Sequence, residues 1–415
     1  MKHGLASRGK KMAAAIALCA SLLLTNAAAI GQPGPPTQPL TFLTLQIDMD
    51  VRPASLQFVR ADDGARHLAY NLFVTNWGNW PLRFARVDVE DAATGRVLVS
   101  YDREALENPY RQRPTPFSLP PTSPQDRDLD VRRTTIFLIE IRLDGDVAPP
   151  AAIRHRILFE PDPGVRLLQD DGSPAPELVS ISPPVAIDGP APIALGPPLR
   201  GGPWLCGNGL GLVSDHNYVG VSHTARMRVS QRYGCDFLKV FSTSVLEILP
   251  NPFPNELTPG MFYGYGEEVL AVANARVVEV RDGIPESTPQ ADGSVRMPVA
   301  RTEDTGPGNR VVLDLGGGRY AFYAHLQPGS IRVRPGDRVR EGQVLGKVGM
   351  AGNAVNPHLH FQVTDGPDLN GSEGMPYVFR SYVLSGHGSD DIPDRTIVNA
   401  VPLRGSVMTF PGGRR

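Results

Sequence analysis

The stretch NPHLHFQV, residues 356–363, has the alternation of a β-strand and carries two histidines two positions apart. Successive side chains of a strand point to opposite faces, so His358 and His360 project from the same face. The opposite face receives apolar side chains that can pack into a core, namely Leu359, Phe361 and Val363. Two imidazoles on one rigid strand can hold a metal with one ring and leave the other for proton transfer. His-x-His also matches by chance, so the rest of the chain must decide between a site and two exposed histidines.

The other ligands of such a metal must come from elsewhere in the fold. Catalytic zinc sites usually have three protein ligands, of histidine and carboxylate type, with water in the fourth position. Asp236 stands at the end of a short apolar stretch, and two histidines precede it, His216 in SDHNY and His223 in VSHT. The chain has no HExxH sequence, which excludes the helical zinc-protease arrangement.

Strand patterns dominate the second half of the chain. Residues 269–280 are predicted to form one or two strands, and residues 310–315 and 319–326 a β-hairpin across three glycines. Residues 333–349 place further glycines where strands must bend tightly. We find no long amphipathic pattern and no internal repeat, so this half is predicted to be an antiparallel β domain.

The first half, residues 41–182, also has a β pattern. Five strands separated by Gly, Asp and Pro turns are predicted at residues 66–76, 82–90, 96–101, 133–143 and 151–160. Strands of this length and spacing are typical of an antiparallel sandwich, and we predict an immunoglobulin-like accessory domain. Residue types with catalytic roles do not cluster here, and His67 and His155 are expected at the surface.

Composition shifts mark the remaining boundaries. Residues 1–29 have a basic start, an apolar run too short to span a bilayer and small residues for cleavage, as in a signal peptide. Residues 30–40 are a proline-rich spacer, and the Pro/Gly-rich residues 183–203 are a linker. The second domain is predicted over residues 204–403, followed by a loose tail at 404–415.

The charge balance excludes one class of partner. The 41 basic and 43 acidic residues give a formal net charge of −2, and removal of the four basic residues of the signal peptide leaves −6. A mildly acidic chain gives no electrostatic argument for binding nucleic acid. No segment after the signal peptide reaches transmembrane length, so we expect a periplasmic or secreted protein.

Two cysteines, Cys206 and Cys235, remain after removal of the signal peptide. In an oxidising compartment they can form a disulfide, whose loop of about thirty residues would add roughly 3–4 kcal/mol of stability. Two buried free thiols are an equally good interpretation of the sequence. A Cys₂His zinc site is a weaker one, because Cys235 adjoins Asp236, the preferred ligand.

The second half resembles the M23 family of zinc endopeptidases, of the lysostaphin and LytM type, which cut peptide bridges of bacterial peptidoglycan. The resemblance runs from about Trp204 to Phe379. It rests on ordered blocks that are specific together: the upstream histidine, YGCDF at 233–237, YGEEVLA at 265–271, YAHLQPGS at 323–330, GDRVREGQVLG at 336–346 and PHLHF at 357–361.

The resemblance implies roles for particular residues. His360 and Asp236, with an upstream histidine, would hold Zn²⁺, while His325 and His358 would be the catalytic pair that does not bind the metal. One would act on the water and the other would stabilise the oxyanion, in an order that the sequence leaves open.

The first histidine ligand departs from the commonest pattern of the family. Many members have it four residues before the aspartate, where this chain has Arg232. A subset has Ser-x-His about twenty residues before Arg-Phe/Tyr-x-x-Asp, and Ser214-Asp-His216 fits that form. His216 is therefore preferred to His223 as the ligand.

The resemblance implies a secreted zinc endopeptidase that cleaves peptide cross-bridges or stems of peptidoglycan by attack of a zinc-bound water. Its N-terminal sandwich would contact the wall or a protein partner. The alternative is a catalytically silent module of this family that binds and activates another cell-wall hydrolase. Because a candidate stands at every site position, the enzyme is favoured.

Overall fold

The computed structural model describes residues 45–107, 128–161, 173, 178–212, 214–218, 221–222, 226–249, 257–290, 294–388 and 390–412. The predicted signal peptide, residues 1–29, and the spacer, residues 30–40, lie outside these ranges. The described chain is mostly β, as predicted; its helical elements are α2 (Arg103–Glu107), η1 (Asp215–Tyr218) and η2 (Pro259–Met261). In the described part of the chain, no helix has the length and apolar character needed to cross a membrane.

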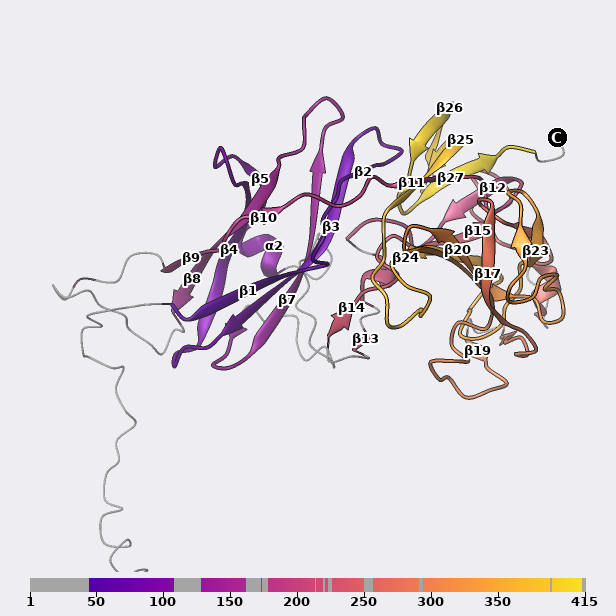
Figure 1. Ribbon diagram of the computed structural model, residues 1–415, viewed down its shortest axis with the longest axis horizontal. Coiled ribbons are helices and arrows are strands. Elements are labelled where there is room, and N and C mark those ends of the chain that lie inside the picture. Colours follow the sequence, from indigo (N-terminus) through magenta and orange to yellow (C-terminus); the bar gives the residue numbers. More distant parts are fainter. Residues whose placement is uncertain are drawn as a thin grey trace, which may run out of the picture.

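Two antiparallel sheets form the N-terminal half (Figure 1). The first contains β1 (Ile47–Arg52), β2 (Val59–Arg60), β3 (Arg66–Asn76) and β7 (Thr134–Leu143). The second contains β4 (Leu82–Asp91), β5 (Val97–Tyr101), β6 (Asp128–Leu129), β8 (Ala152–Pro161), β9 (Leu178–Ile181) and β10 (Val185–Ala186). Apolar side chains from both sheets share one core. The immunoglobulin-like assignment stays a prediction.

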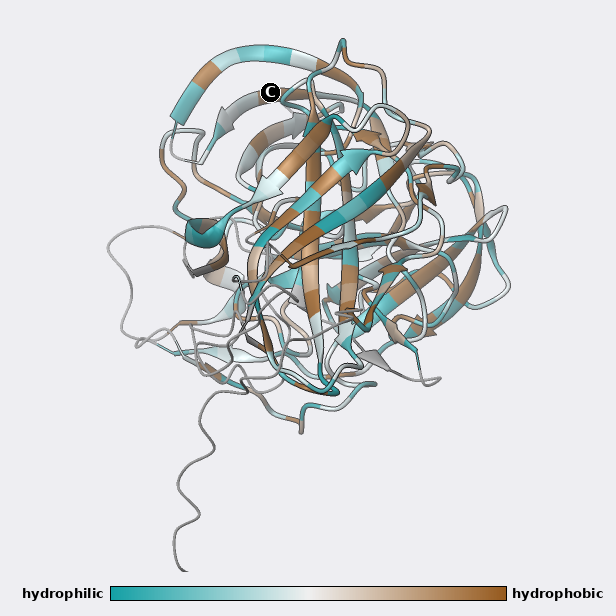
Figure 2. Cartoon of the chain, turned by 90° about the vertical axis from the view of Figure 1, so that its left-hand side faces the viewer, coloured by the Kyte–Doolittle hydropathy of each residue, from teal (hydrophilic) through white to brown (hydrophobic). Residues whose placement is uncertain are grey.

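Alternation along β3 explains how this half packs. Leu68, Tyr70, Leu72 and Val74 face the shared core, which is the period-2 pattern of a strand. Figure 2 shows the same alternation as bands of brown and teal along the strands that face the viewer. The outward face of β3 is therefore free to contact the C-terminal half.

The prediction that His67 and His155 lie at the surface was wrong. His67 is 4% exposed, and its ring contacts Glu140 and Asp63. His155 is fully buried, with Nε2 2.7 Å from the Tyr70 hydroxyl. Both imidazoles are buried because polar partners inside the sandwich satisfy them.

The C-terminal half is built on an eleven-stranded sheet of order β11-β25-β27-β12-β15-β24-β21-β20-β17-β22, with β26 on β25. Its strands are β11 (Ile193–Leu195), β12 (Gly201–Cys206), β15 (Cys235–Lys239), β17 (Ala275–Arg281), β20 (Asn309–Gly316), β21 (Arg319–Leu326), β22 (Arg338–Val339), β24 (Leu359–Thr364), β25 (Tyr377–His387), β26 (Asp390–Ala400) and β27 (Ser406–Phe410). Three two-stranded sheets flank it: β13 (Val221–Ser222) with β14 (Met227–Arg228), β16 (Glu268–Leu270) with β23 (Val344–Lys347), and β18 (Thr288–Pro289) with β19 (Val295–Arg296).

The predicted linker and tail both take part in sheets. Within residues 183–203, β10 pairs with β8 of the sandwich and β11 pairs with β25 of the large sheet. The prediction of a loose tail at 404–415 was wrong for β27, which pairs with both β12 and β25. Apolar side chains drive this insertion, because Val407, Met408 and Phe410 are at most 1% exposed.

Candidate metal centre

Strand pairing brings two distant residues together at the middle of the large sheet. β24 lies between β15 and β21, in a register that sets Asp236 opposite His360 and His360 opposite Ala324. Nδ1 of His360 lies 2.8 Å from Oδ1 of Asp236, although 124 positions separate the two residues. β24, which carries His360 and begins directly after His358, is therefore the floor of a site.

A third candidate ligand comes from the short helix η1. Nε2 of His216 lies 3.2 Å from Oδ2 of Asp236, and one potential ligand atom from each of His216, Asp236 and His360 lies within 4.8 Å of the others. All three residues are buried. His223, the other histidine considered from sequence, lies outside the described residues.

The donor set fits a cation. Three nitrogen and oxygen donors of this kind are those of a catalytic zinc site. Nδ1 of His216 is buried and has no hydrogen-bond partner among the described residues. Asn208 donates from Nδ2 to Oδ2 of Asp236 at 3.0 Å and so orients the carboxylate.

Gln362 determines which nitrogen of His360 carries the proton. Its amide nitrogen donates to the Ser230 carbonyl at 3.1 Å, so its oxygen is turned to Nε2 of His360, 2.7 Å away. Nε2 must then carry the proton, which leaves a lone pair on Nδ1 toward the Asp236 carboxylate. A lone pair facing a carboxylate is repulsive unless a cation or an extra proton lies between them. Burial lowers the pKa of His360, which disfavours the extra proton.

His325 and His358 form a second pair beside this group. Their ring centroids are 4.7 Å apart, and the centroid of His325 lies 6.0 Å from that of His360. Each Nδ1 donates to a backbone carbonyl at 2.8 Å, His325 to Ala351 and His358 to Asn356. Since a carbonyl only accepts, Nδ1 carries the proton on both rings. Nε2 of His358 lies 3.5 Å from Oδ1 of Asp236.

The electrostatics of the pair are unequal. Burial, together with the neighbouring imidazoles of His358 and His360, lowers the pKa of His325 well below its usual value. Burial also disfavours the charged form of His358, but the Asp236 carboxylate outweighs it and raises the pKa of His358. Burial alone would raise the pKa of Asp236, whereas His216 and His358 hold it well below its usual range. The neutral form is therefore favoured at His325 and the charged form at His358.

His325 also has an unusual backbone. Its φ angle is +62°, in the left-handed region that non-glycine residues rarely occupy. Two backbone hydrogen bonds hold it there, from His325 to the Pro307 carbonyl at 3.0 Å and from Gly349 to the His325 carbonyl at 3.1 Å. Strain of this kind is typical of positions where a side chain is aimed at a reactant.

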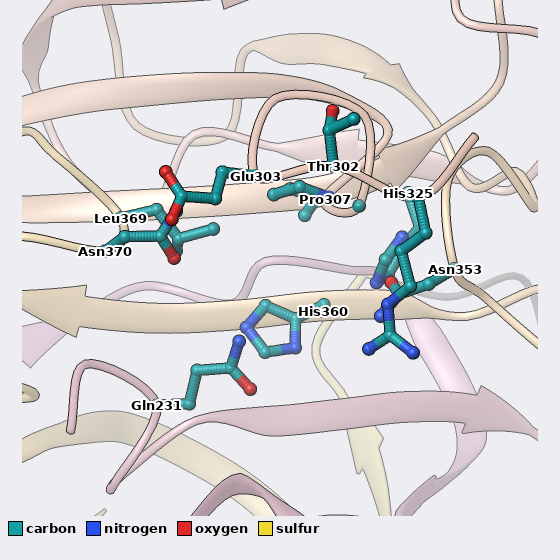
Figure 3. A pocket seen from close by; sticks show the side chains of 12 residues that line it. Gln231, Thr302, Glu303, Pro307, His325, Asn353, His360, Leu369 and Asn370 are labelled. Carbon is teal, nitrogen blue, oxygen red and sulfur yellow. The ribbon is translucent and has the colours of Figure 1, made fainter. Parts of the chain in front are cut away.

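An open pocket of about 440 Å³ lies over these residues (Figure 3). His360 lies at its centre with Gln231 beside it, and Thr302, Glu303, Pro307, Leu369 and Asn370 form its walls around His325 and Asn353. The lining combines the amides of Gln231, Asn353 and Asn370 with the charged side chains of Arg301 and Glu303, so the pocket offers both hydrogen-bond donors and acceptors.

Sequence reasoning missed several residues of the site. Gln362 had a usable signal, because it stands two positions after His360 on the same face of the strand. Gln231 and Asn353 had no such signal, since neither belongs to a sequence motif that indicates a catalytic or binding role. Tyr323 and Tyr265 have structural partners instead: Tyr323 is buried and accepts a hydrogen bond from the Val272 amide at 2.9 Å, and Tyr265 donates to Glu286 at 2.8 Å.

Comparison with known proteins identifies the class of the C-terminal half. Residues 260–372 match the model of peptidase family M23, so this part of the chain is an M23 peptidase domain, in the place that the resemblance predicted. The match includes His325, His358 and His360 and begins after Asp236. The chain is similar to lysostaphin of Staphylococcus simulans, with 27% identity over 136 residues, 31% of this chain and 23% of that protein.

A second relative is the glycyl-glycine endopeptidase ALE-1 of Staphylococcus capitis, with 30% identity over 130 residues, 31% of this chain and 35% of that protein. The matched part thus spans about a quarter to a third of the curated relatives. Among solved structures, the catalytic domain of the prophage-encoded M23 protein EnpA from Enterococcus faecalis aligns with 18% identity and a TM-score of 0.25 over 43% of this chain and 92% of that one. The M23 metalloprotease pseudoalterin aligns with 14% identity and a TM-score of 0.26 over 54% and 100%.

Proposed function

We propose that this protein is a zinc-dependent endopeptidase that cleaves the peptide part of bacterial peptidoglycan. The observation that carries the proposal is the convergence of His216, Asp236 and His360 within 4.8 Å, on the floor of an open pocket that also holds His325. These residues come from η1, β15, β24 and β21, and a purely structural role does not require them to meet under a groove.

His216, Asp236 and His360 are the residues that would hold the ion. Zinc supplies, when bound, a water of pKa near 7 and a Lewis acid that polarises the scissile carbonyl. Asn208 and Gln362 keep the carboxylate and the His360 ring in the binding orientation.

His325 and His358 would perform the proton chemistry. Each presents Nε2 toward the reacting centre, because each Nδ1 is held by a backbone carbonyl. The raised pKa of His358 suits a proton donor to the oxyanion or the leaving amine, and the lowered pKa of His325 suits a neutral base.

The substrate class follows from the relatives and from the pocket. One relative is named a glycyl-glycine endopeptidase and another lysostaphin, and lysostaphin is called an antimicrobial peptidase in the solved structure of its catalytic domain. The pocket is lined by amide side chains, by Gly306 and by the charged Arg301 and Glu303, a surface that could hold a polar peptide such as a cross-bridge or stem. The predicted signal peptide, residues 1–29, would deliver the protein to the periplasm or the medium, where this substrate lies.

The alternative of a silent activating module is less well supported. A silent member would be expected to lack a ligand or a catalytic histidine, whereas this structure gathers His216, Asp236 and His360 and sets His325 against His358.

The test combines metal analysis with digestion of purified peptidoglycan. We expect about one zinc per chain and soluble peptide fragments detected by mass spectrometry, whose new termini identify the bond cut. His360→Ala should lose both zinc and product. His387→Ala, which changes an exposed histidine at the end of β25, should lose neither. Zinc binding without any product would refute the hydrolase and favour the activating module, and absence of zinc would refute the metal centre.

A further inference from the structure

The sandwich contacts the peptidase domain at a gap in its own sheet. Along one edge of β3, β1 pairs up to Asn71 and β2 pairs from His67, so Ala69 lies between the two partners. The Tyr233 hydroxyl of the peptidase domain fills this gap: it donates to the Ala69 carbonyl at 3.3 Å and accepts from the Ala69 amide at 3.4 Å. Ala69 also belongs to the apolar core of the C-terminal half.

A buried arginine crosses the same boundary. Arg232 is 1% exposed; its Nη1 donates to Oδ1 of Asn71 in β3 at 2.6 Å, and its Nη2 to Oε2 of Glu373 at 3.3 Å. Glu373 also accepts from the Val229 amide at 3.2 Å. A guanidinium removed from water is destabilising unless its partners are fixed, so Asn71 and Glu373 together determine where Arg232 can lie.

Arg232 and Tyr233 stand in the turn at residues 230–233, directly before Asp236 in β15. The turn contacts the candidate metal centre at other points as well. The Ser230 carbonyl accepts from the amide of Gln362, the residue that orients His360. A Cβ placed on Gly234 would come within 3.1 Å of Nδ1 of His216, so the backbone there lies against that ring. One short turn therefore touches the surroundings of all three candidate ligands.

We propose that the N-terminal sandwich serves as a clamp on this turn, and that Asn71, Arg232 and Tyr233 are positioning residues of the metal centre. The proposal rests on the proposed metal-dependent function and gives the sandwich a role inside the molecule. The sandwich fixes the turn on the side away from the reaction, so the ligand geometry depends on an intact junction between the two halves.

The sandwich is placed where it can hold the turn at residues 230–233, and it does not block the pocket. Among the described residues, every side chain that lines the large pocket comes from the C-terminal half, between Gln231 and Asn370. The described part of the sandwich thus leaves the pocket open and contacts the turn at residues 230–233.

The experiment compares two disruptions of the same junction in the full-length chain. Asn71→Ala removes the acceptor of Arg232 next to the metal-ligand turn, and Tyr233→Phe removes only the hydroxyl at Ala69. The matched control is Asp62→Asn, because Asp62 is 3% exposed and links the halves elsewhere, accepting from the Tyr382 hydroxyl at 3.2 Å and from the Leu403 amide at 3.4 Å. Asn71→Asp restores an acceptor for Arg232 and serves as the rescue variant.

Zinc affinity, measured by competition with a chromogenic chelator, is the first readout. Loss of residues that orient metal ligands lowers metal affinity about 10- to 100-fold, and we expect Asn71→Ala to fall in that range and Tyr233→Phe at its lower end. Asp62→Asn should bind zinc as the wild type does, even with a lower Tm, and Asn71→Asp should recover most of the loss. Equal zinc affinity in the wild type, Asn71→Ala and Tyr233→Phe would overturn the clamp.

Amide hydrogen exchange of the metal-free proteins is the second readout and separates the two proposals. Faster exchange at residues 229–236 in Asn71→Ala and Tyr233→Phe, but not in Asp62→Asn, is the expected result. If the wild type binds no zinc, the proposed function fails, and the exchange of this segment still decides the clamp. Should Asn71→Ala not fold, Tyr233→Phe carries both measurements.

Discussion

Nε2 of His360 lies 2.7 Å from Oε1 of Gln362, and both side chains are buried on one face of β24. The other end of the Gln362 amide is held by the Ser230 carbonyl, so its oxygen cannot turn away from the ring. The proton of His360 is thereby kept on Nε2, and the lone pair of Nδ1 is directed at Asp236. A neutral side chain next to the site thus fixes the tautomer of a candidate metal ligand.

Replacing Gln362 by leucine should weaken zinc binding by about 10- to 100-fold, because the ring of His360 loses the acceptor that fixes its tautomer. Gln362→Glu keeps the acceptor for His360 but loses the donor to the Ser230 carbonyl, so its zinc affinity should lie between those of the leucine variant and the wild type. Chelator competition on the purified proteins measures both. Unchanged affinity in the leucine variant would show that the ring needs no such support.

Replacing His325 by alanine should separate metal binding from hydrolysis. His325 supplies no atom to the His216–Asp236–His360 group, so zinc content should stay near that of the wild type. Peptidoglycan hydrolysis should fall by roughly 10²-fold or more, since a group that transfers protons or stabilises the oxyanion is lost. Full activity in this variant would remove His325 from the mechanism.

Deprotonation of His67 should destabilise the sandwich at mildly alkaline pH. Burial disfavours the charged ring, but its hydrogen bonds to the carboxylates of Asp63 and Glu140 outweigh this effect and raise the pKa of His67 to about 9. A raised pKa means that the folded state binds the proton more tightly. The stabilisation is therefore complete below pH about 6.5 and is lost as the pH rises through about 9.

Urea unfolding of the wild type and His67→Gln between pH 6 and 10 measures this effect. The free energy of unfolding of the wild type should drop by at most about 3 kcal/mol across the interval, and the variant should show a smaller slope. Parallel curves for the two proteins would contradict a charged His67.

Removal of the disulfide should destabilise the C-terminal half. Cys206 and Cys235, 29 positions apart in sequence, are joined in a disulfide with Cα atoms 5.7 Å apart, which settles the alternatives that the sequence left open. Replacing both by alanine should lower the free energy of unfolding by about 3–4 kcal/mol, because the unfolded chain regains the freedom of that loop. Chemical denaturation of both forms checks this, and a loss below about 1 kcal/mol would contradict the loop-entropy account.

The sequence predicted the parts of the fold that depend on local patterns. The hairpin of β20 and β21 and the two-faced strand β24 follow from alternation and from glycine turns. The same reasoning failed for β27. Its sequence is too short to predict a strand, and it becomes one because it pairs with β12 on one side and β25 on the other. It also failed for His67 and His155, because the partners that allow their burial lie on other strands.

The sequence by itself determined which side chains share a face, because the period of a strand is a local property of the backbone. Alternation alone therefore places His358, His360 and Gln362 in one row. Only the tertiary structure decided that His360 meets Asp236 across 124 positions and that Arg232 meets Asn71 across 161. Such contacts depend on strand order and on how two cores pack together, and no short stretch of sequence contains that information.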